Sequence, residues 1–269
     1  MRILWIGGNH PRHFYYLNKI HEVFPVSGAI IENRVGGTNS KSPLPPKNLS
    51  IKDKNNFLRH FNNRRSKEEF YFGNQKFPKI PSITVSKNTL NGKKSIKLLK
   101  KISPDVVLIY GCHLLKTPLT DFLPKNTINL HGGLSPRYRG TATMFWPFYF
   151  LEPNHVGVTF HNIISEPDAG NIIHQSVPKL ELGDSIHDVS CKAIITATKD
   201  MLKILKLLNN GIELKKFKQT SSGKNFLERD FKIEHLRLIY DVFDDKIVDS
   251  FLMKKIYTKK PKIINQFRD

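Results

Sequence analysis

Residues 127–140 read Thr-Ile-Asn-Leu-His-Gly-Gly-Leu-Ser-Pro-Arg-Tyr-Arg-Gly, and this stretch decides the fold prediction. It begins with β-branched and aliphatic residues, which favour a strand. Side chains two positions apart in a strand point to the same face, so Asn129 and His131 should project together. Gly132 and Gly133 follow at once and allow a ligand to approach the backbone closely. An amide donor and an imidazole at the end of a strand therefore predict a reaction centre.

The same pattern also has a structural interpretation. An Asn-x-His pair is common, and a histidine at the end of a strand is more often hydrogen-bonded into the fold than catalytic. A second segment favours catalysis, because residues 156–175 contain a strand, a loop ending in Asp168-Ala169-Gly170, and another strand. A carboxylate on such a loop is the partner that a histidine needs for orientation or for proton transfer.

Taken together, these motifs resemble those of the folate-dependent formyltransferases. That family includes methionyl-tRNA formyltransferase, glycinamide ribonucleotide formyltransferase and the sugar N-formyltransferases. The resemblance is clear over residues 104–180 and weaker over 1–33. The matching motifs are Asn129-x-His131, Leu134-Ser-Pro-Arg-Tyr-Arg-Gly140, Gly157-Val-Thr159, Asp168-Ala-Gly170 and Ile172-Ile-x-Gln175.

The resemblance implies a catalytic trio and a folate co-substrate. The trio maps onto Asn129, His131 and Asp168, and the co-substrate is 10-formyltetrahydrofolate, with no metal ion. The backbone that follows the strand at 105–110 is implied to face the pterin, at Tyr110, Gly111, Cys112 and Leu114. The family's Ser-Leu-Leu-Pro loop, which contacts folate, maps with two letters changed onto Gly133, Leu134, Ser135 and Pro136.

The order of the predicted elements indicates an α/β fold. A strand at 3–6, a helix at 12–23 and a strand at 26–31 form a βαβ unit, which predicts parallel strands. The nearly all-apolar run at 105–110 indicates a strand buried on both faces. We therefore expect an open, mostly parallel, Rossmann-like twisted sheet with helices on both faces, plus a small C-terminal appendage.

Several basic and polar residues are candidates for binding the second substrate. Asn9, His10 and Arg12 lie at the start of the first predicted helix, where a phosphate could bind. The alternative is that they are solvent-facing residues of an ordinary helix start. Arg137 and Arg139 add two fixed positive charges beside the predicted reaction centre.

Length and spacing predict a main domain at 1–211 and a small C-terminal segment at 212–269, and the resemblance implies that the main domain is a formyltransferase catalytic domain. A loop is expected at 34–55, and helices at 55–72, 141–151, 185–209 and 233–243. No apolar run approaches the roughly 18 residues of a membrane span. The two cysteines, Cys112 and Cys191, cannot form a disulfide framework, so we expect a reduced, cytoplasmic protein.

The formal net charge of +20 leaves the partner open. The leading hypothesis is N-formylation of a nucleotide-linked amino sugar, because some sixty residues after 211 are short for the C-terminal barrel of methionyl-tRNA formyltransferases. The charge favours the alternative of charged initiator tRNA, and also a non-catalytic nucleic-acid-binding protein. Hydrolysis of the formyl donor is a further alternative. The C-terminal segment is a candidate dimer contact.

Overall fold

The computed structural model describes residues 1–34, 42–221 and 223–267. Part of the loop predicted at 34–55, namely 35–41, lies outside the described residues. Among the described residues no helix is both long enough and apolar enough to cross a membrane.

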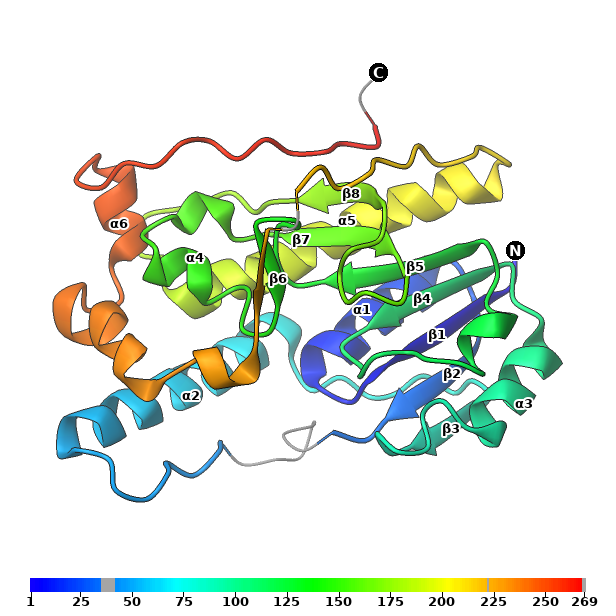
Figure 1. Ribbon diagram of the computed structural model, residues 1–269, viewed down its shortest axis with the longest axis horizontal. Coiled ribbons are helices and arrows are strands. Elements are labelled where there is room, and N and C mark those ends of the chain that lie inside the picture. The colour runs from blue at the N-terminus through cyan, green and yellow to red at the C-terminus, as the bar shows by residue number, and fades with distance from the viewer. Residues whose placement is uncertain (35–41, 222, 268–269) are drawn as a thin grey trace.

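Seven strands form one twisted sheet in the order β3-β2-β1-β4-β5-β7-β8 (Figure 1). The strands β1 to β5 are parallel, whereas β7 runs antiparallel to β5 and to β8. Their bounds are β1 Ile3–Gly8, β2 Val26–Glu32, β3 Ser82–Val85, β4 Val106–Tyr110, β5 Asn126–His131, β7 Val158–Asn162 and β8 Ile172–Ser176. The predicted open, mostly parallel sheet is confirmed.

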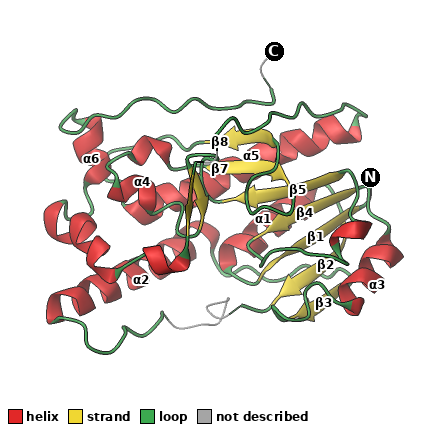
Figure 2. Ribbon diagram, viewed as in Figure 1, coloured by secondary structure: helices red, strands yellow, loops and turns green. Residues whose placement is uncertain are grey.

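Helices cover both faces of this sheet (Figure 2). The α-helices are α1 Pro11–Val23, α2 Ile51–Phe72, α3 Lys93–Ile102, α4 Trp146–Tyr149, α5 Ile186–Asn209 and α6 Ile247–Leu252. Alternate side chains of β4 enter two separate cores, as the period of two in a strand requires. Leu108 packs in the core that contains α1 and α5, while Val107 packs in the core that contains Leu99 of α3.

Two helices predicted from apolar spacing are shorter than predicted. Within 141–151 only Trp146–Tyr149 is α-helical, because Ala142 and Leu151 adopt left-handed φ angles of 54° and 57°. Within 233–243 the chain forms a 3₁₀ turn at Ile233–His235 and a π-helical turn at Leu238–Val242. In both places apolar side chains pack as predicted, but the backbone does not keep regular α-helical geometry over the whole predicted range.

The loop after β4 is tied to the end of β2. The buried carboxylate of Glu32 accepts a hydrogen bond of 2.7 Å from the backbone N–H of His113, and it also contacts the His113 ring. Arg34 donates from Nη1 to the carbonyl of Gly111 at 2.9 Å. These contacts fix the loop at the carboxyl end of the sheet, where open parallel sheets bind ligands.

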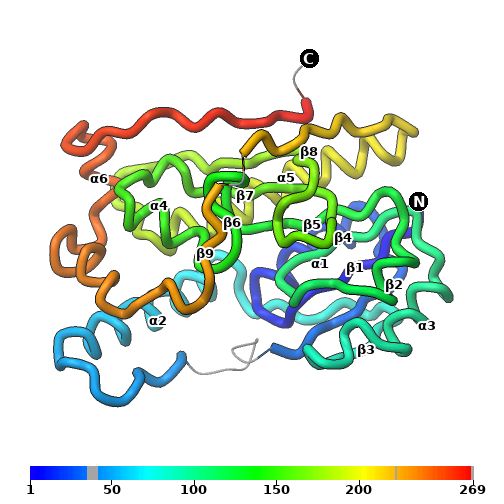
Figure 3. Tube along the Cα trace, in the orientation of Figure 1, coloured from blue at the N-terminus to red at the C-terminus, as the bar shows by residue number. Residues whose placement is uncertain are grey.

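The segment after α5 folds back over the rest of the chain. It adds the strand β9 (Lys224–Phe226), which pairs in parallel with β6 (Tyr138–Gly140) beside the carboxyl end of β5 (Figure 1). Residues 264–266 run along β8 (Figure 3), where the backbone N–H of Gln175 donates to the carbonyl of Ile264 at 2.8 Å and that of Gln266 donates to His174 Nδ1 at 3.1 Å. The predicted boundary at 211 follows the end of α5, and the segment beyond it packs against β6, β8 and α2.

Candidate active site

Asn129 and His131 lie on one face of β5, and β7 places two further polar side chains beside them. The antiparallel register pairs Asn129 with His161 and His131 with Thr159. The two residues of β7 are almost completely buried, with exposed fractions of 2% and 0%. Asn129 Nδ2 lies 3.0 Å from His161 Nε2. The sheet therefore builds a four-residue polar cluster from two neighbouring strands.

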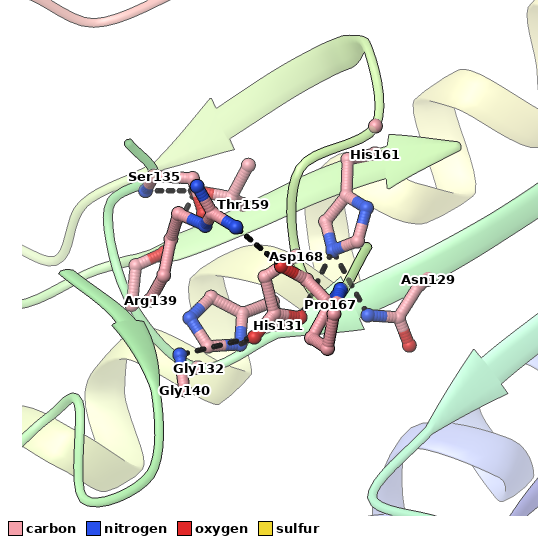
Figure 4. Close-up of polar contacts among 12 residues, drawn as sticks. Asn129, His131, Gly132, Ser135, Arg139, Gly140, Thr159, His161, Pro167 and Asp168 are labelled. Carbon is pink, nitrogen blue, oxygen red and sulfur yellow. Dashed lines mark hydrogen bonds and ion pairs between the residues drawn. The ribbon is translucent and has the colours of Figure 1, made fainter. Parts of the chain in front are cut away.

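Asp168 reaches this cluster from the loop between β7 and β8 and lies between two imidazoles (Figure 4). Its Oδ2 is 3.3 Å from His131 Nδ1, and its Oδ1 is 3.4 Å from His161 Nε2. The backbone N–H of Gly140 donates to Oδ2 at 3.1 Å. The structure thus brings the three predicted catalytic residues together, with His161 linking Asn129 to Asp168.

The charges of the cluster depend on one another. Burial alone would raise the pKa of Asp168, but the two imidazoles and the Gly140 N–H hold that pKa well below its ordinary value. Burial lowers the pKa of His131, and the negative charge of Asp168 opposes this effect. His131 Nε2 also lies 3.0 Å from the carbonyl of Tyr138, so a protonated ring would have a partner for each N–H group. This geometry suits a histidine that gains and loses a proton.

Contacts from two other parts of the chain hold the Asp168 loop. Arg139, which is 4% exposed, donates from Nη2 to Glu166 Oε1 at 2.6 Å and to the carbonyl of Pro167 at 2.7 Å. Gln219 donates from Nε2 to the carbonyls of Asp168 and Gly170, both at 2.8 Å. Asp168 itself has a φ of 52°, a left-handed conformation that a non-glycine residue keeps only when its surroundings impose it.

Thr159 fixes the glycine-containing loop after β5. Its hydroxyl donates to the carbonyl of Gly133 at 2.7 Å and accepts from the backbone N–H of Ser135 at 2.9 Å. Gln175 Nε2 donates to the carbonyl of Ser135 at 2.7 Å, and the side chain of Leu134 is buried. The backbone groups of this loop are therefore bonded within the protein, which sets the path of the chain around His131.

A cavity of about 690 Å³ opens beside these strands, between the loop after β4 and the loop after β7. Leu114, Leu115, Ile163 and Ile164 give it apolar walls. It also borders three lysines, Lys116, Lys125 and Lys216. A volume of this size, with apolar walls and a few charged groups, is typical of a small-molecule site.

Of the eight residues predicted to hold the donor, Leu114 lines this cavity. Tyr110 is buried with its ring edge-on against His13, and Gly111 accepts the Arg34 bond. Cys112 packs in the α3 core, where burial raises its thiol pKa to about 12. Pro136 lines a separate groove with Arg137 and Tyr138, while Gly133, Leu134 and Ser135 are held by β7 and β8 as described.

The residues predicted for the second substrate have partners within the chain. Asn9 Nδ2 donates to Asn33 at 2.8 Å. His10 caps α1, and burial together with the charge of Arg12 lowers its pKa to about 4. Arg12 forms an ion pair of 2.5 Å with Glu68, and Arg137 forms one of 2.5 Å with Glu152. Arg139, from β6, contacts the Asp168 loop as described above. The structure therefore gives each of these side chains a role in holding loops and helices together.

The sequence analysis gave no role to two residues of the cluster, His161 and Thr159, although Thr159 belongs to the Gly157-Val-Thr159 motif. The signal for them is the alternation Thr159-x-His161 on a strand, which repeats the Asn129-x-His131 pattern. The strand pairing that places the two patterns side by side is a contact between distant parts of the chain, and spacing along the sequence does not reveal it. Among the described residues no group of three or more His, Cys, Asp or Glu side chains is placed to hold a metal ion.

Comparison with known proteins identifies the family. Residues 52–205, more than half of the chain, match the formyl transferase family. The chain belongs to this family. It is therefore a folate-dependent formyltransferase, as the motifs around His131 and Asp168 predicted.

Solved structures of other family members share the fold at low sequence identity. A sugar N-formyltransferase from a Shewanella species is 16% identical, with a TM-score of 0.54 over 86% of this chain and 78% of that one. Phosphoribosylglycinamide formyltransferase from Anaplasma phagocytophilum is 16% identical, with a TM-score of 0.55 over 84% and 96%. An N-formyltransferase from Helicobacter canadensis, solved with folinic acid and dTDP-3-aminofucose, is 18% identical, with a TM-score of 0.51 over 86% and 73%.

Replacing Thr159 with valine tests whether this hydroxyl holds the loop around His131. The change keeps the shape but leaves the buried Gly133 carbonyl and Ser135 N–H without their partner, and each unpaired group costs about 1–3 kcal/mol. We expect the free energy of unfolding in urea to fall by about 2–6 kcal/mol, the sum for the two groups, together with a loss of formyl transfer.

Thr198→Val is the matched control. Thr198 is also buried, in α5, and its hydroxyl donates to the carbonyl of Ile194 at 2.7 Å. That carbonyl also accepts a backbone hydrogen bond within the helix, so it keeps a partner when the hydroxyl is removed. This variant should lose about 1 kcal/mol or less. Equal losses in the two variants would contradict the role given to Thr159.

Proposed function

We propose that this protein transfers the formyl group of 10-formyltetrahydrofolate to the primary amine of a nucleotide-linked amino sugar, in the cytoplasm. The observation that carries the proposal is the meeting of Asp168 with His131 and His161 at the carboxyl edge of the sheet, where Asn129 contacts His161. Thr127 of β5 and Asn162 of β7, which neighbour this cluster along their strands, line the cavity. An amide donor, a titratable imidazole and a carboxylate are the groups that acyl transfer to an amine requires.

In this proposal each residue of the trio has a separate task. Attack of the amine on the formyl carbon gives a tetrahedral intermediate with a negatively charged oxygen, and Asn129 Nδ2 donates a hydrogen bond to that oxygen. His131 takes the proton that the amine loses and returns it to the leaving nitrogen of the folate as the carbon–nitrogen bond breaks. Asp168 stabilises the imidazolium form of His131 while it holds the proton.

The cavity beside β5 and β7 is proposed to hold the donor. Its apolar walls, formed by Leu114, Leu115, Ile163 and Ile164, suit the ring system of a folate. Its lysines suit the negatively charged glutamate tail, which all folates carry. Folinic acid in the related Helicobacter canadensis enzyme supports this choice of donor.

Two observations support a small amine as acceptor. The segment after α5 pairs with β6 and covers β8, so within the described residues it is not a separate barrel. The Helicobacter canadensis relative binds dTDP-3-aminofucose. The net charge of +20 favours the alternative acceptor, charged initiator tRNA.

The direct test is incubation of the purified protein with 10-formyltetrahydrofolate and a panel of amines, with release of tetrahydrofolate and mass of the product as readouts. We expect formylation of at least one nucleotide-linked amino sugar, and much slower reaction of the same sugar without its nucleotide. If only aminoacylated tRNA is formylated, and its binding weakens steeply as salt is added, then tRNA and not a sugar is the acceptor. Formate release without amine consumption would contradict transfer.

Substitutions in the trio test its assignment. Asn129→Ala should lower kcat about ten- to a thousandfold, the loss expected for one oxyanion donor. His131→Ala and Asp168→Ala should be at least as damaging, and the double variant should be far from additive because the two side chains act as a unit. Asn154→Ala is the control, since this asparagine contacts the carbonyl of Lys259 far from the cluster. Near-normal turnover of the Asp168 variant would remove it from the trio.

A further inference from the structure

His161 makes three polar contacts that together define its state. Its Nδ1 lies 2.8 Å from the carbonyl oxygen of Asn162. Its Nε2 lies 3.0 Å from Asn129 Nδ2 and 3.4 Å from Asp168 Oδ1. The side chain is 3% exposed, so water does not substitute for any of these partners. The trio alone does not explain why a buried histidine stands directly behind the oxyanion donor.

The backbone carbonyl decides which ring nitrogen carries the hydrogen. A carbonyl oxygen can only accept, so Nδ1 must donate to Asn162. In the neutral ring Nε2 is then an acceptor, and the group that satisfies it must be a donor. Asn129 can meet this demand only with its Nδ2, because its Oδ1 has no hydrogen. Figure 4 shows the amide nitrogen of Asn129 on the side of His161 and the amide oxygen pointing away.

We propose that His161 is a positioning residue that sets the amide orientation of Asn129. The neutral Nδ1–H ring holds one hydrogen of Asn129 Nδ2, which keeps the second hydrogen available for the oxyanion. Protonation of Nε2 reverses the demand, and the amide then turns its oxygen towards His161. The catalytic consequence rests on the proposed function, whereas the orientation itself does not.

The groups that face His161 leave Asn129 as the donor to Nε2. Among the described residues the others are the carboxylate of Asp168, from the loop after β7, and the ring of His131, from β5, whose centroid is 6.3 Å away. The guanidinium of Arg139, from β6, lies beyond them against Glu166 and Pro167. The carboxylate of Asp168 has no hydrogen to donate, so the hydrogen that Nε2 of the neutral ring accepts comes from Asn129 Nδ2 at 3.0 Å.

Nitrogen NMR of the ligand-free protein tests the orientation without any assay of activity. With ¹⁵N-labelled histidine and asparagine, His161 at pH 8 should give the Nδ1–H tautomer. A coupling across the hydrogen bond from Asn129 Nδ2 to His161 Nε2 should also be detected. An Nε2–H tautomer at pH 8 would overturn the proposal, as would the absence of that coupling.

Kinetics test the consequence for transfer. His161→Gln keeps a hydrogen-bond acceptor for Asn129 Nδ2, so it should retain most of kcat. His161→Leu removes the acceptor and should lower kcat about tenfold, the lower end of the loss of an oxyanion donor, with an unchanged KM for the donor. In the Asn129→Ala background the same leucine change should have almost no further effect.

A matched control separates this role from general damage to the sheet. His174 is also 2% exposed, lies in the adjacent strand β8 and contacts Asp200 at 3.2 Å, away from the cluster. His174→Gln and His174→Leu should both leave kcat close to the wild-type value. Additive losses from His161→Leu and Asn129→Ala would overturn the proposal. A wild-type protein that shows the predicted NMR coupling but transfers no formyl group would instead contradict the proposed function alone.

Discussion

The placement of one carboxylate between two imidazoles is the interaction on which the rest of the site depends. Asp168 faces His131 at 3.3 Å and His161 at 3.4 Å, and each ring has its other nitrogen against a backbone carbonyl. Each ring therefore has a partner for a proton on either nitrogen, and the carboxylate favours one extra proton in the cluster. Transfer of a formyl group from one nitrogen to another needs a buried group that can hold a proton for a short time.

The fold supplies this interaction through one exception to its parallel topology. Because β7 runs antiparallel to β5, Thr159 and His161 lie opposite His131 and Asn129, and the loop after β7 returns Asp168 to the same edge. A left-handed φ of 52° at Asp168 is imposed by Arg139 and the Gly140 N–H, both of β6, and by Gln219 from the segment after α5. The energy that holds this strained residue comes from the scaffold around it.

The sequence predicted the features that depend on residues close together in the chain. The apolar run at β4 and the βαβ order at the start predicted the parallel sheet, and the Asn129-x-His131 and Asp168 motifs predicted the enzyme family, which the family match confirmed. His161 and Gln219 could not be found in this way, because strand register and a contact across some fifty residues are properties of the folded chain. The predicted contacts of Arg12 and Arg137 with substrate remain predictions, and the structure shows both with carboxylate partners.

The most direct test of this account is the titration of the Asp168 carboxyl group, followed by ¹³C NMR of the wild-type protein. The ion pairs with His131 and His161 and the Gly140 hydrogen bond predict a midpoint well below the ordinary value of about 4 for an aspartate. Replacing either histidine with an uncharged residue should raise that midpoint. A midpoint at or above the ordinary value in the wild-type protein would mean that burial outweighs the two imidazoles, and would contradict the proposed centre.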